Sequence, residues 1–217
     1  MNSDEQRRRD MKWAMQTQER LVVPILRETY HAEVVSKDLT DREWDSQGID
    51  KIIKQGKNSF FLSVRSRTHG GYPQRKSPLN VTIRSERPIG TAEIHHLNAR
   101  YSFYGVTNAQ NNSVPATSFF WWVIYRLHSL RGALDDGRLK LGGELWKKYP
   151  DISSWQPGIK EEYNEDGTKW LQIPLSLLEN EKWLVARYTK KGGLEQIDKN
   201  AELYNARIKL KLEDFFR

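Results

Sequence analysis

The spacing of hydrophobic and polar residues follows two periods along this chain, and the first is helical. Between residues 3 and 29, apolar positions recur near helical spacing. Ser3 and the two acids after it suit a helix start, because the helix dipole favours negative charge there. Pro24 lies inside this pattern and has no amide hydrogen, so we expect it to kink or divide the helix. The pattern therefore predicts an interrupted N-terminal helix.

The middle of the chain has the shorter period of β-strands. We expect a hairpin with strands at 48–53 and 60–64 and a turn at 54–58. Polar, glycine- and proline-rich stretches predict loops. The further strands expected are 31–36, 79–83, 100–106, 169–174 and 183–189; the loops are 37–47, 67–78 and 107–115. Residues 84–100 are ambiguous, and the tail 201–217 fits a helix or a strand.

The stretch 116–133 is the most apolar and aromatic part of the chain, and we expect it to form a helix that packs on the sheet. Its aromatic residues are expected in the core. A short helical segment is expected at 175–179. Strands in the middle with helices at both flanks predict an α/β fold with a mixed central β-sheet flanked by helices.

The length fits a single domain over residues 1–217. We expect an N-terminal helix at 1–30, a core at 31–133 and a C-terminal extension of the same domain at 134–217. The chain has no cysteine, which excludes disulfides and cysteine nucleophiles and fits a cytoplasmic protein. Neither a signal peptide nor a transmembrane helix is expected, because no long apolar run follows the basic N-terminus.

Positive charge is concentrated in one part of the sequence. The net charge is +7, and residues 51–120 hold ten Lys and Arg against two acids, Glu86 and Glu93. Such a basic segment favours a polyanionic partner, most often nucleic acid, although a solvated basic face has the same composition. A membrane partner is not expected, because the basic residues do not lie on one amphipathic helix.

Acidic residues lie where this basic segment begins. Asp41, Asp45 and Asp50 precede or enter the hairpin, and Glu19 lies on the predicted first helix. Carboxylates are the ligands that Mg²⁺ prefers, and a bound Mg²⁺ polarises a phosphate and activates water. A nearby cation stabilises the charge that develops in phosphodiester cleavage. These residues therefore predict a metal and phosphate site.

Residues 47–53, Gly56 and residues 60–67 resemble the core of the PD-(D/E)xK, or restriction-endonuclease-like, nuclease superfamily. The resemblance covers about 27 residues. It implies that Asp50 binds Mg²⁺ or Mn²⁺ and that Glu19 is a second, helical ligand. It also implies a restriction-endonuclease-like fold, a DNA endonuclease activity and a homodimer, since many nucleases of this superfamily are dimers.

The chain departs from the superfamily motif at two positions. Ser63 and Arg65 stand where the motif has an acid and a lysine. A hydroxyl binds Mg²⁺ less well than a carboxylate, and an arginine clamps phosphate but is a poor substitute for a lysine that contacts the attacking water. Two interpretations follow. Either another carboxylate completes the site, or the chain is a catalytically degenerate nuclease-fold DNA-binding or assembly subunit. The carboxylates considered are Asp45, Glu33, Glu86 and Glu93.

In the catalytic interpretation Asp50, Arg65, Glu19 and Ser63 form the catalytic site. The residues expected to contact nucleic acid are Lys51, Arg67, His69, Arg75 and Lys76. The adjacent His95 and His96 would point to opposite faces of a strand and are not expected to chelate one metal together. No nucleotide-binding loop or hydrolase motif is present. An enzyme with a small anionic substrate is a third possibility.

Overall fold

A computed structural model describes residues 3–36, 50–55, 58–69, 80–86, 98–136, 138–139, 159–163, 167–201 and 203. The predicted loop at 37–47, residues 70–78 of the predicted loop 67–78, and most of the tail after 201 lie outside these residues. The helices are α1 (Ser3–Thr17), the π-helical turn η1 (Gln18–Val22), α2 (Val23–Tyr30), α4 (Leu127–Asp135) and α6 (Leu175–Asn180). The strands are β1 (Glu33–Ser36), β2 (Lys51–Gln55), β3 (Asn58–Arg67), β4 (Asn80–Glu86), β5 (Tyr101–Thr107), β6 (Phe119–Arg126), β7 (Lys160–Tyr163), β8 (Lys169–Pro174), β9 (Leu184–Thr189) and β10 (Gly193–Gln196).

The predicted N-terminal helix is interrupted beside Pro24. The turn η1 separates α1 from α2, and the amide of Val23 donates to the carbonyl of Gln18, five residues earlier. Pro24 supplies no amide for the carbonyl four residues before it, which favours a widened turn at this point. The α2 helix ends at His31, whose φ of 50° is left-handed. The prediction of a helix divided near Pro24 is confirmed.

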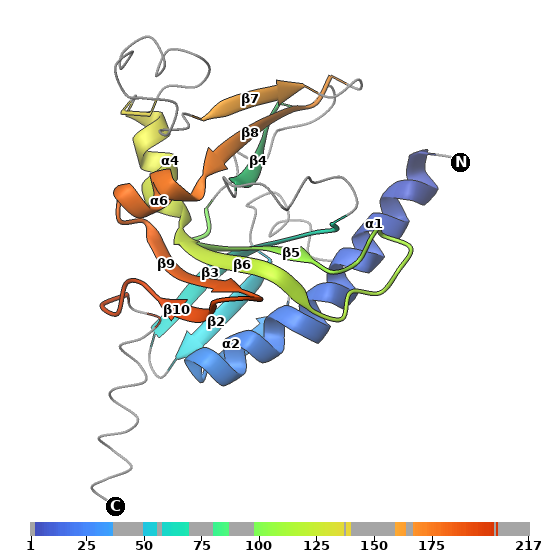
Figure 1. The fold of residues 1–217 in the computed structure, drawn as a ribbon, viewed down its shortest axis with the longest axis horizontal. Coiled ribbons are helices and arrows are strands. Elements are labelled where there is room, and N and C mark those ends of the chain that lie inside the picture. Colours follow the sequence, from blue (N-terminus) through green and yellow to red (C-terminus); the bar gives the residue numbers. More distant parts are fainter. Residues whose placement is uncertain are drawn as a thin grey trace, which may run out of the picture.

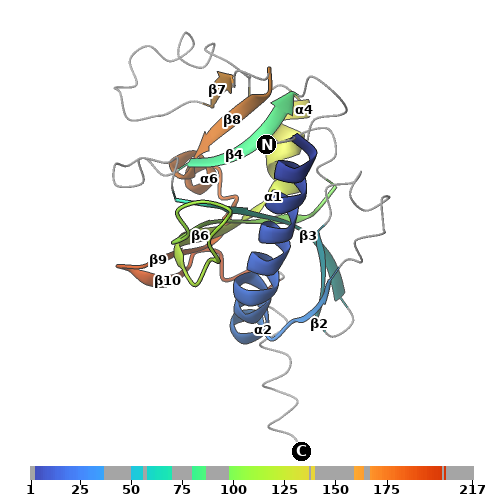
Figure 2. The same cartoon turned by 90° about the vertical axis from the view of Figure 1, so that its right-hand side faces the viewer.

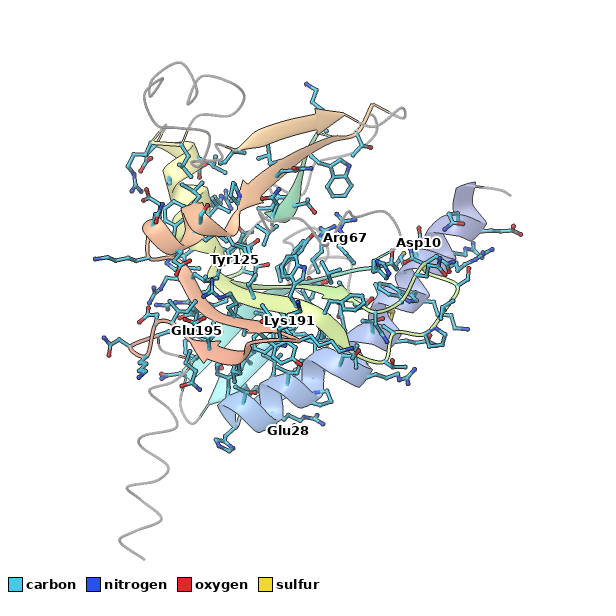
Figure 3. All side chains as sticks on the ribbon, viewed as in Figure 1. Asp10, Glu28, Arg67, Tyr125, Lys191 and Glu195 are labelled. Atoms are coloured by element: carbon cyan, nitrogen blue, oxygen red, sulfur yellow. The ribbon has the colours of Figure 1, made fainter. Side chains whose placement is uncertain are left out.

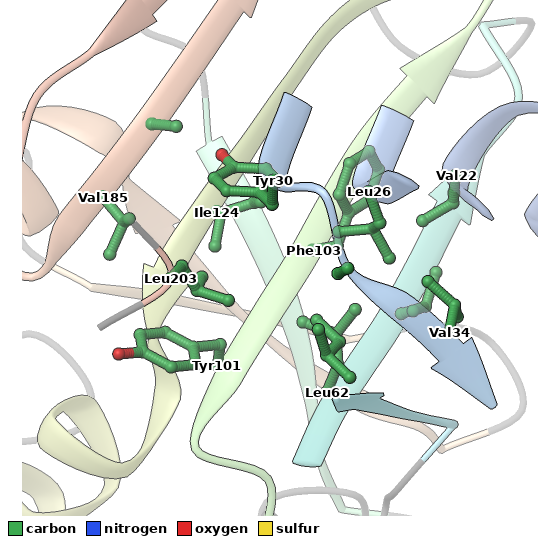
Figure 4. Packing of buried hydrophobic residues seen from close by; sticks show 14 of the residues in the cluster. Val22, Leu26, Tyr30, Val34, Leu62, Tyr101, Phe103, Ile124, Val185 and Leu203 are labelled. Atoms are coloured by element: carbon green, nitrogen blue, oxygen red, sulfur yellow. The ribbon is translucent and has the colours of Figure 1, made fainter. Parts of the chain in front are cut away.

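A mixed seven-stranded sheet forms the centre of the molecule, in the order β1-β2-β3-β5-β6-β9-β10 (Figure 1). Only the β3–β5 pair is parallel, and the other neighbours are antiparallel. The helices α1 and α2 lie along one face of this sheet. Apolar residues of η1 and α2, such as Val22 and Leu26, pack against Leu62, Phe103 and Ile124 of the sheet (Figure 4).

The other face of the sheet is covered by a second layer. A three-stranded antiparallel sheet, in the order β4-β8-β7, lies there with α4 and α6 beside it (Figures 1 and 2). Val81 and Ile83 of β4 belong to the same buried cluster as Tyr104, Trp121 and other residues of the large sheet. The α/β class and the mixed sheet are therefore confirmed. The expectation of a sheet flanked by helices is only partly met, because a second sheet shares one face of the large sheet with α4 and α6.

The prediction of a helix at 116–133 is wrong. Residues 119–126 form β6, a central strand, and only the residues from Leu127 onward are helical. Both faces of β6 are buried: Trp122 and Ile124 face the helix layer, while Trp121 and Val123 face the second layer. A strand covered on both sides carries an unbroken apolar run, which has no two-residue period. The expectation that its aromatic residues belong to the core is confirmed, since four of the five are buried.

The other predicted elements are present with shifts of at most three residues at their ends. The hairpin, the strands β1, β4, β5, β8 and β9, and the short helix α6 all lie where the pattern placed them. In the part expected to be a C-terminal extension, β9 and β10 complete the large sheet and β8 pairs with β4. No helix among the described residues is long and apolar enough to cross a membrane.

Candidate functional site

The strand β3 presents a row of mostly polar side chains toward the second layer. Side chains alternate between the two faces of a strand. Leu62 and Val64 point toward α1 and α2, where they join the buried cluster. The residues between and beside them therefore share the opposite face: Phe61, Ser63, Arg65 and Arg67. The motif positions 63 and 65 thus lie on one face of one strand, as the resemblance implies.

Asp50 lies at the entrance to the hairpin, opposite Ser63. Its backbone amide donates to the carbonyl of Leu62 at 3.0 Å, which extends the register in which Lys51 pairs with Leu62. The carboxylate oxygen Oδ2 accepts a hydrogen bond from the amide of Val64 at 2.7 Å and a longer one from Ser63 Oγ at 3.4 Å. The half-buried carboxylate is therefore oriented by β3 itself. Asp50, Ser63 and Arg65 share one face.

The site continues across the sheet as a row of buried hydroxyl groups. Ser63 pairs with Ser102 of β5, and Ser102 pairs with Tyr125 of β6. The three residues are 6%, 4% and 2% exposed. Figure 3 places Tyr125 between the large sheet and the second layer. The half-buried Asp50, which directly precedes β2, thus lies at one end of a series of polar side chains that continues over β3, β5 and β6.

Glu19 contacts Lys51 instead of entering this row. Lys51 Nζ donates to Glu19 Oε1 at 2.6 Å, and the Lys51 side chain is 6% exposed against 50% for Glu19. Lys51 pairs with Leu62, so its side chain points to the helix side of the sheet, away from Ser63. The pair links η1 to β2. The predicted roles of Glu19 as a metal ligand and of Lys51 as a phosphate contact stay predictions.

The carboxylates near Asp50 can be surveyed only over the residues that the structure describes. Among the described residues, no group of three or more His, Asp and Glu side chains could hold a metal ion. Glu33 forms an ion pair of 3.8 Å with Lys54. Asp41, Asp45, Glu93 and the side chain of Glu86 lie outside the described residues. Mg²⁺ in proteins is often held by one or two carboxylates, with water and substrate phosphate as its other ligands. Asp50 with Ser63 fits such a minimal site.

Arg67 lies between the two sheets (Figure 3). Its Nη2 donates to Thr82 Oγ1 at 3.2 Å, and its guanidinium stacks on Trp170 at 4.4 Å. The Thr82 hydroxyl is 3.1 Å from that of Tyr104. Arg67 Nε is buried and has no hydrogen-bond partner. The guanidinium therefore joins β3 to the three-stranded sheet, and its predicted contact with nucleic acid stays a prediction.

Thr82, Tyr104 and Trp170 were not among the predicted site residues. Thr82 belongs to β4 and Trp170 to β8, and the two strands meet only through a pairing of distant segments. A short-range pattern gives no sign of such a pairing. Arg67 pairs with Val106, two register positions beyond the Arg65–Tyr104 pair on the neighbouring strands β3 and β5, which also could not be predicted without the parallel pairing.

The remaining predicted contacts are placed only in part. His69 follows β3, packs edge-on against Phe120 at 5.2 Å, and has a buried Nδ1 without a hydrogen-bond partner. Arg75, Lys76, His95 and His96 lie outside the described residues.

Comparison of the chain with protein-family models, with curated proteins and with solved structures found no match.

Proposed function

We propose that this chain binds nucleic acid along the exposed part of the β3 face and hydrolyses DNA phosphodiester bonds at Asp50 with a divalent metal ion. The observation that carries the proposal is the arrangement of Asp50, Ser63 and Arg65. They lie on one face, with a carboxylate at the entrance of the hairpin and a guanidinium further along the strand. This is the arrangement that the superfamily resemblance implies, and Ser63 and Arg65 belong to the basic segment 51–120.

Binding would depend on charge. The ten basic residues of 51–120 raise the local concentration of a polyanion, and their attraction weakens as salt increases. Arg65 lies two residues beyond Ser63 and is half-exposed. A guanidinium contacts two phosphate oxygens at once, so Arg65 would fix the position of a phosphate relative to Asp50.

The catalytic part of the proposal assigns roles to the same residues. The Asp50 carboxylate would hold Mg²⁺ or Mn²⁺, with the Ser63 hydroxyl beside it. The bound ion would polarise the phosphate and activate a water molecule. The amide of Val64 keeps the carboxylate in place by its 2.7 Å hydrogen bond. Arg65 would stabilise the negative charge that develops on the phosphate oxygens.

A second candidate function is a non-catalytic nuclease-fold DNA-binding or assembly subunit. Two observations favour it. Ser63 supplies a hydroxyl where the superfamily motif has a carboxylate, and Glu19 is engaged by Lys51. Under this alternative, Asp50 is a structural residue that satisfies the Val64 amide just beyond the point where the pairing of β2 with β3 ends.

A cleavage assay separates the two. Supercoiled plasmid and short structured DNA are incubated with Mg²⁺, with Mn²⁺ and with EDTA, and binding is measured across a salt series. The variants are Asp50→Ala and, as a control, Glu28→Ala, which removes an exposed acid on α2 (Figure 3). Metal-dependent nicking that disappears only in Asp50→Ala supports the nuclease. Salt-sensitive binding without nicking supports the second candidate. Failure to retain DNA at moderate salt contradicts both and favours a small anionic substrate.

A gain-of-function variant adds a second test. Ser63→Asp places a carboxylate beside Asp50, where the superfamily motif has one. If the chain is a degenerate nuclease, we expect nicking to appear in Ser63→Asp but not in the unmodified protein. If the unmodified protein is already active, we expect Ser63→Asp to lower the Mg²⁺ concentration that gives half-maximal nicking.

A further inference from the structure

Phe61 is an exposed aromatic ring on β3, between two buried residues. Its side chain is 44% exposed, whereas its neighbours Phe60 and Leu62 are 4% and 0% exposed. Its cross-strand partner on β2, Ile52, is half-buried. The described residues have three other large apolar side chains with comparable exposure. Those lie on α1, in the loop after β5 and on β10: Met11, Val114 and Leu194.

The position of Phe61 distinguishes it from ordinary exposed apolar residues. It lies on the same face of β3 as Ser63 and Arg65. Two residues along a strand span about 6.7 Å, so the ring is one side-chain step from Ser63 and from the Asp50 carboxylate opposite it. The Phe61 ring and the Arg65 guanidinium thus lie on the same face of β3, and the Asp50 carboxylate contacts β3 between them, at Ser63. These are the groups that would meet a base, a scissile phosphate and a neighbouring phosphate.

We propose that Phe61 is a stacking platform for a nucleobase next to the phosphate bound at Asp50 and Arg65. This inference rests on the proposed function and makes it more specific. Bases in an intact duplex stack on one another and do not offer a free face to a protein side chain. An aromatic side chain binds the face of an unpaired base of any sequence. The preferred substrate is therefore single-stranded DNA, or DNA with unpaired bases, with little sequence preference at this position.

The test compares three probes of equal length by fluorescence anisotropy, in EDTA so that cleavage does not interfere. The probes are a single-stranded oligothymidine, a blunt duplex, and a strand in which abasic sites replace the bases. The variants are Phe61→Ala, Phe61→Trp, which keeps an aromatic face, and Leu194→Ala, which removes another exposed apolar side chain. Thermal unfolding of each variant checks that the fold is retained.

Stacking on one base is worth roughly five- to a hundred-fold in affinity. We expect Phe61→Ala to lose affinity for oligothymidine by that factor, while its affinities for the duplex and the abasic strand stay within about two-fold. We expect Phe61→Trp and Leu194→Ala to bind oligothymidine like the unmodified protein. Equal losses on all three probes, or no loss on oligothymidine, would overturn the stacking role while leaving the nucleic-acid function intact. Failure of the unmodified protein to bind any probe would overturn both.

Discussion

Replacing Glu19 by Gln removes the charge that faces a buried ammonium group. The Lys51 side chain is 6% exposed and its Nζ lies 2.6 Å from Glu19 Oε1. Breaking a fully buried ion pair costs about 3–5 kcal/mol, because one charge is left buried, whereas exposed pairs contribute about 0–1 kcal/mol. Glu19 is 50% exposed, so water screens part of the interaction. We therefore expect Glu19→Gln to lower the free energy of unfolding by about 1–3 kcal/mol.

A substitution of the other member of the ion pair gives the matched comparison. Lys51→Met keeps a long side chain but removes the buried charge, and the half-exposed Glu19 carboxylate that remains is hydrated. We expect Lys51→Met to cost less than Glu19→Gln. We also expect the double variant to be no less stable than Lys51→Met alone, which is a coupling between the two positions.

Urea unfolding of the four proteins, followed by circular dichroism, measures these differences. If the free energy of unfolding of Glu19→Gln lies within about 0.5 kcal/mol of that of the unmodified protein, this account of Lys51 is refuted. It is also refuted if the effects of the two single substitutions add in the double variant.

The Glu19→Gln variant also tests a catalytic role of Glu19. If Glu19 is also a metal ligand, as the resemblance implies, Glu19→Gln will raise the Mg²⁺ concentration needed for cleavage. If Glu19 only holds Lys51, that concentration will not change.

Two further predictions concern packing and titration. A Cβ added at Gly105 would lie 2.5 Å from Phe119 Cε1, so Gly105→Ala should lower the free energy of unfolding by about 1–3 kcal/mol, and adding Phe119→Leu should restore part of it. An unchanged urea midpoint for Gly105→Ala would contradict the packing of β5 against this ring. The hydrogen bonds that Arg138 donates lower the pKa of the Asp136 carboxyl below 3.8, so this carboxylate stabilises the fold above that pH and the contribution is lost as the pH falls through the lowered pKa. Titration by NMR should show a midpoint below 3.8 that returns toward 3.8 in Arg138→Ala, and equal midpoints in both proteins would exclude Arg138 as the cause.

The hairpin could be predicted because its signals are local. Short apolar runs with β-branched and aromatic residues mark both strands, and Gly56 stands between them in the sequence. Pro24 gives an equally local signal for the divided helix. The family resemblance grouped Asp50 with Ser63 and Arg65, and the hairpin register of the structure brings Asp50 opposite Ser63.

The error at 116–133 has a physical cause. Periodicity separates helices from strands only when one face is polar, and β6 is covered on both faces. Length did not resolve the ambiguity either, because β6 continues directly into α4 without a loop. The two elements together have the length of one buried helix.

Interactions between distant segments could not be predicted. The contact of Arg67 with Thr82 and Trp170 requires that β4 pair with β8, which lies about 90 residues further along the chain. The pairing of Glu19 with Lys51 depends on how η1 packs against β2. The sequence singled out these charged residues as candidates, but their partners are set by tertiary packing.

The central claim is that the β3 face carrying Asp50, Ser63 and Arg65 contacts nucleic acid. Photocrosslinking tests it most directly, with an oligonucleotide that contains bromodeoxyuridine and with mass spectrometry to identify the crosslinked peptides. The account predicts crosslinks within β3, at Phe61 and its neighbours, that are lost with excess unlabelled oligonucleotide. Specific crosslinks confined to other elements, such as the β9–β10 hairpin, would contradict it.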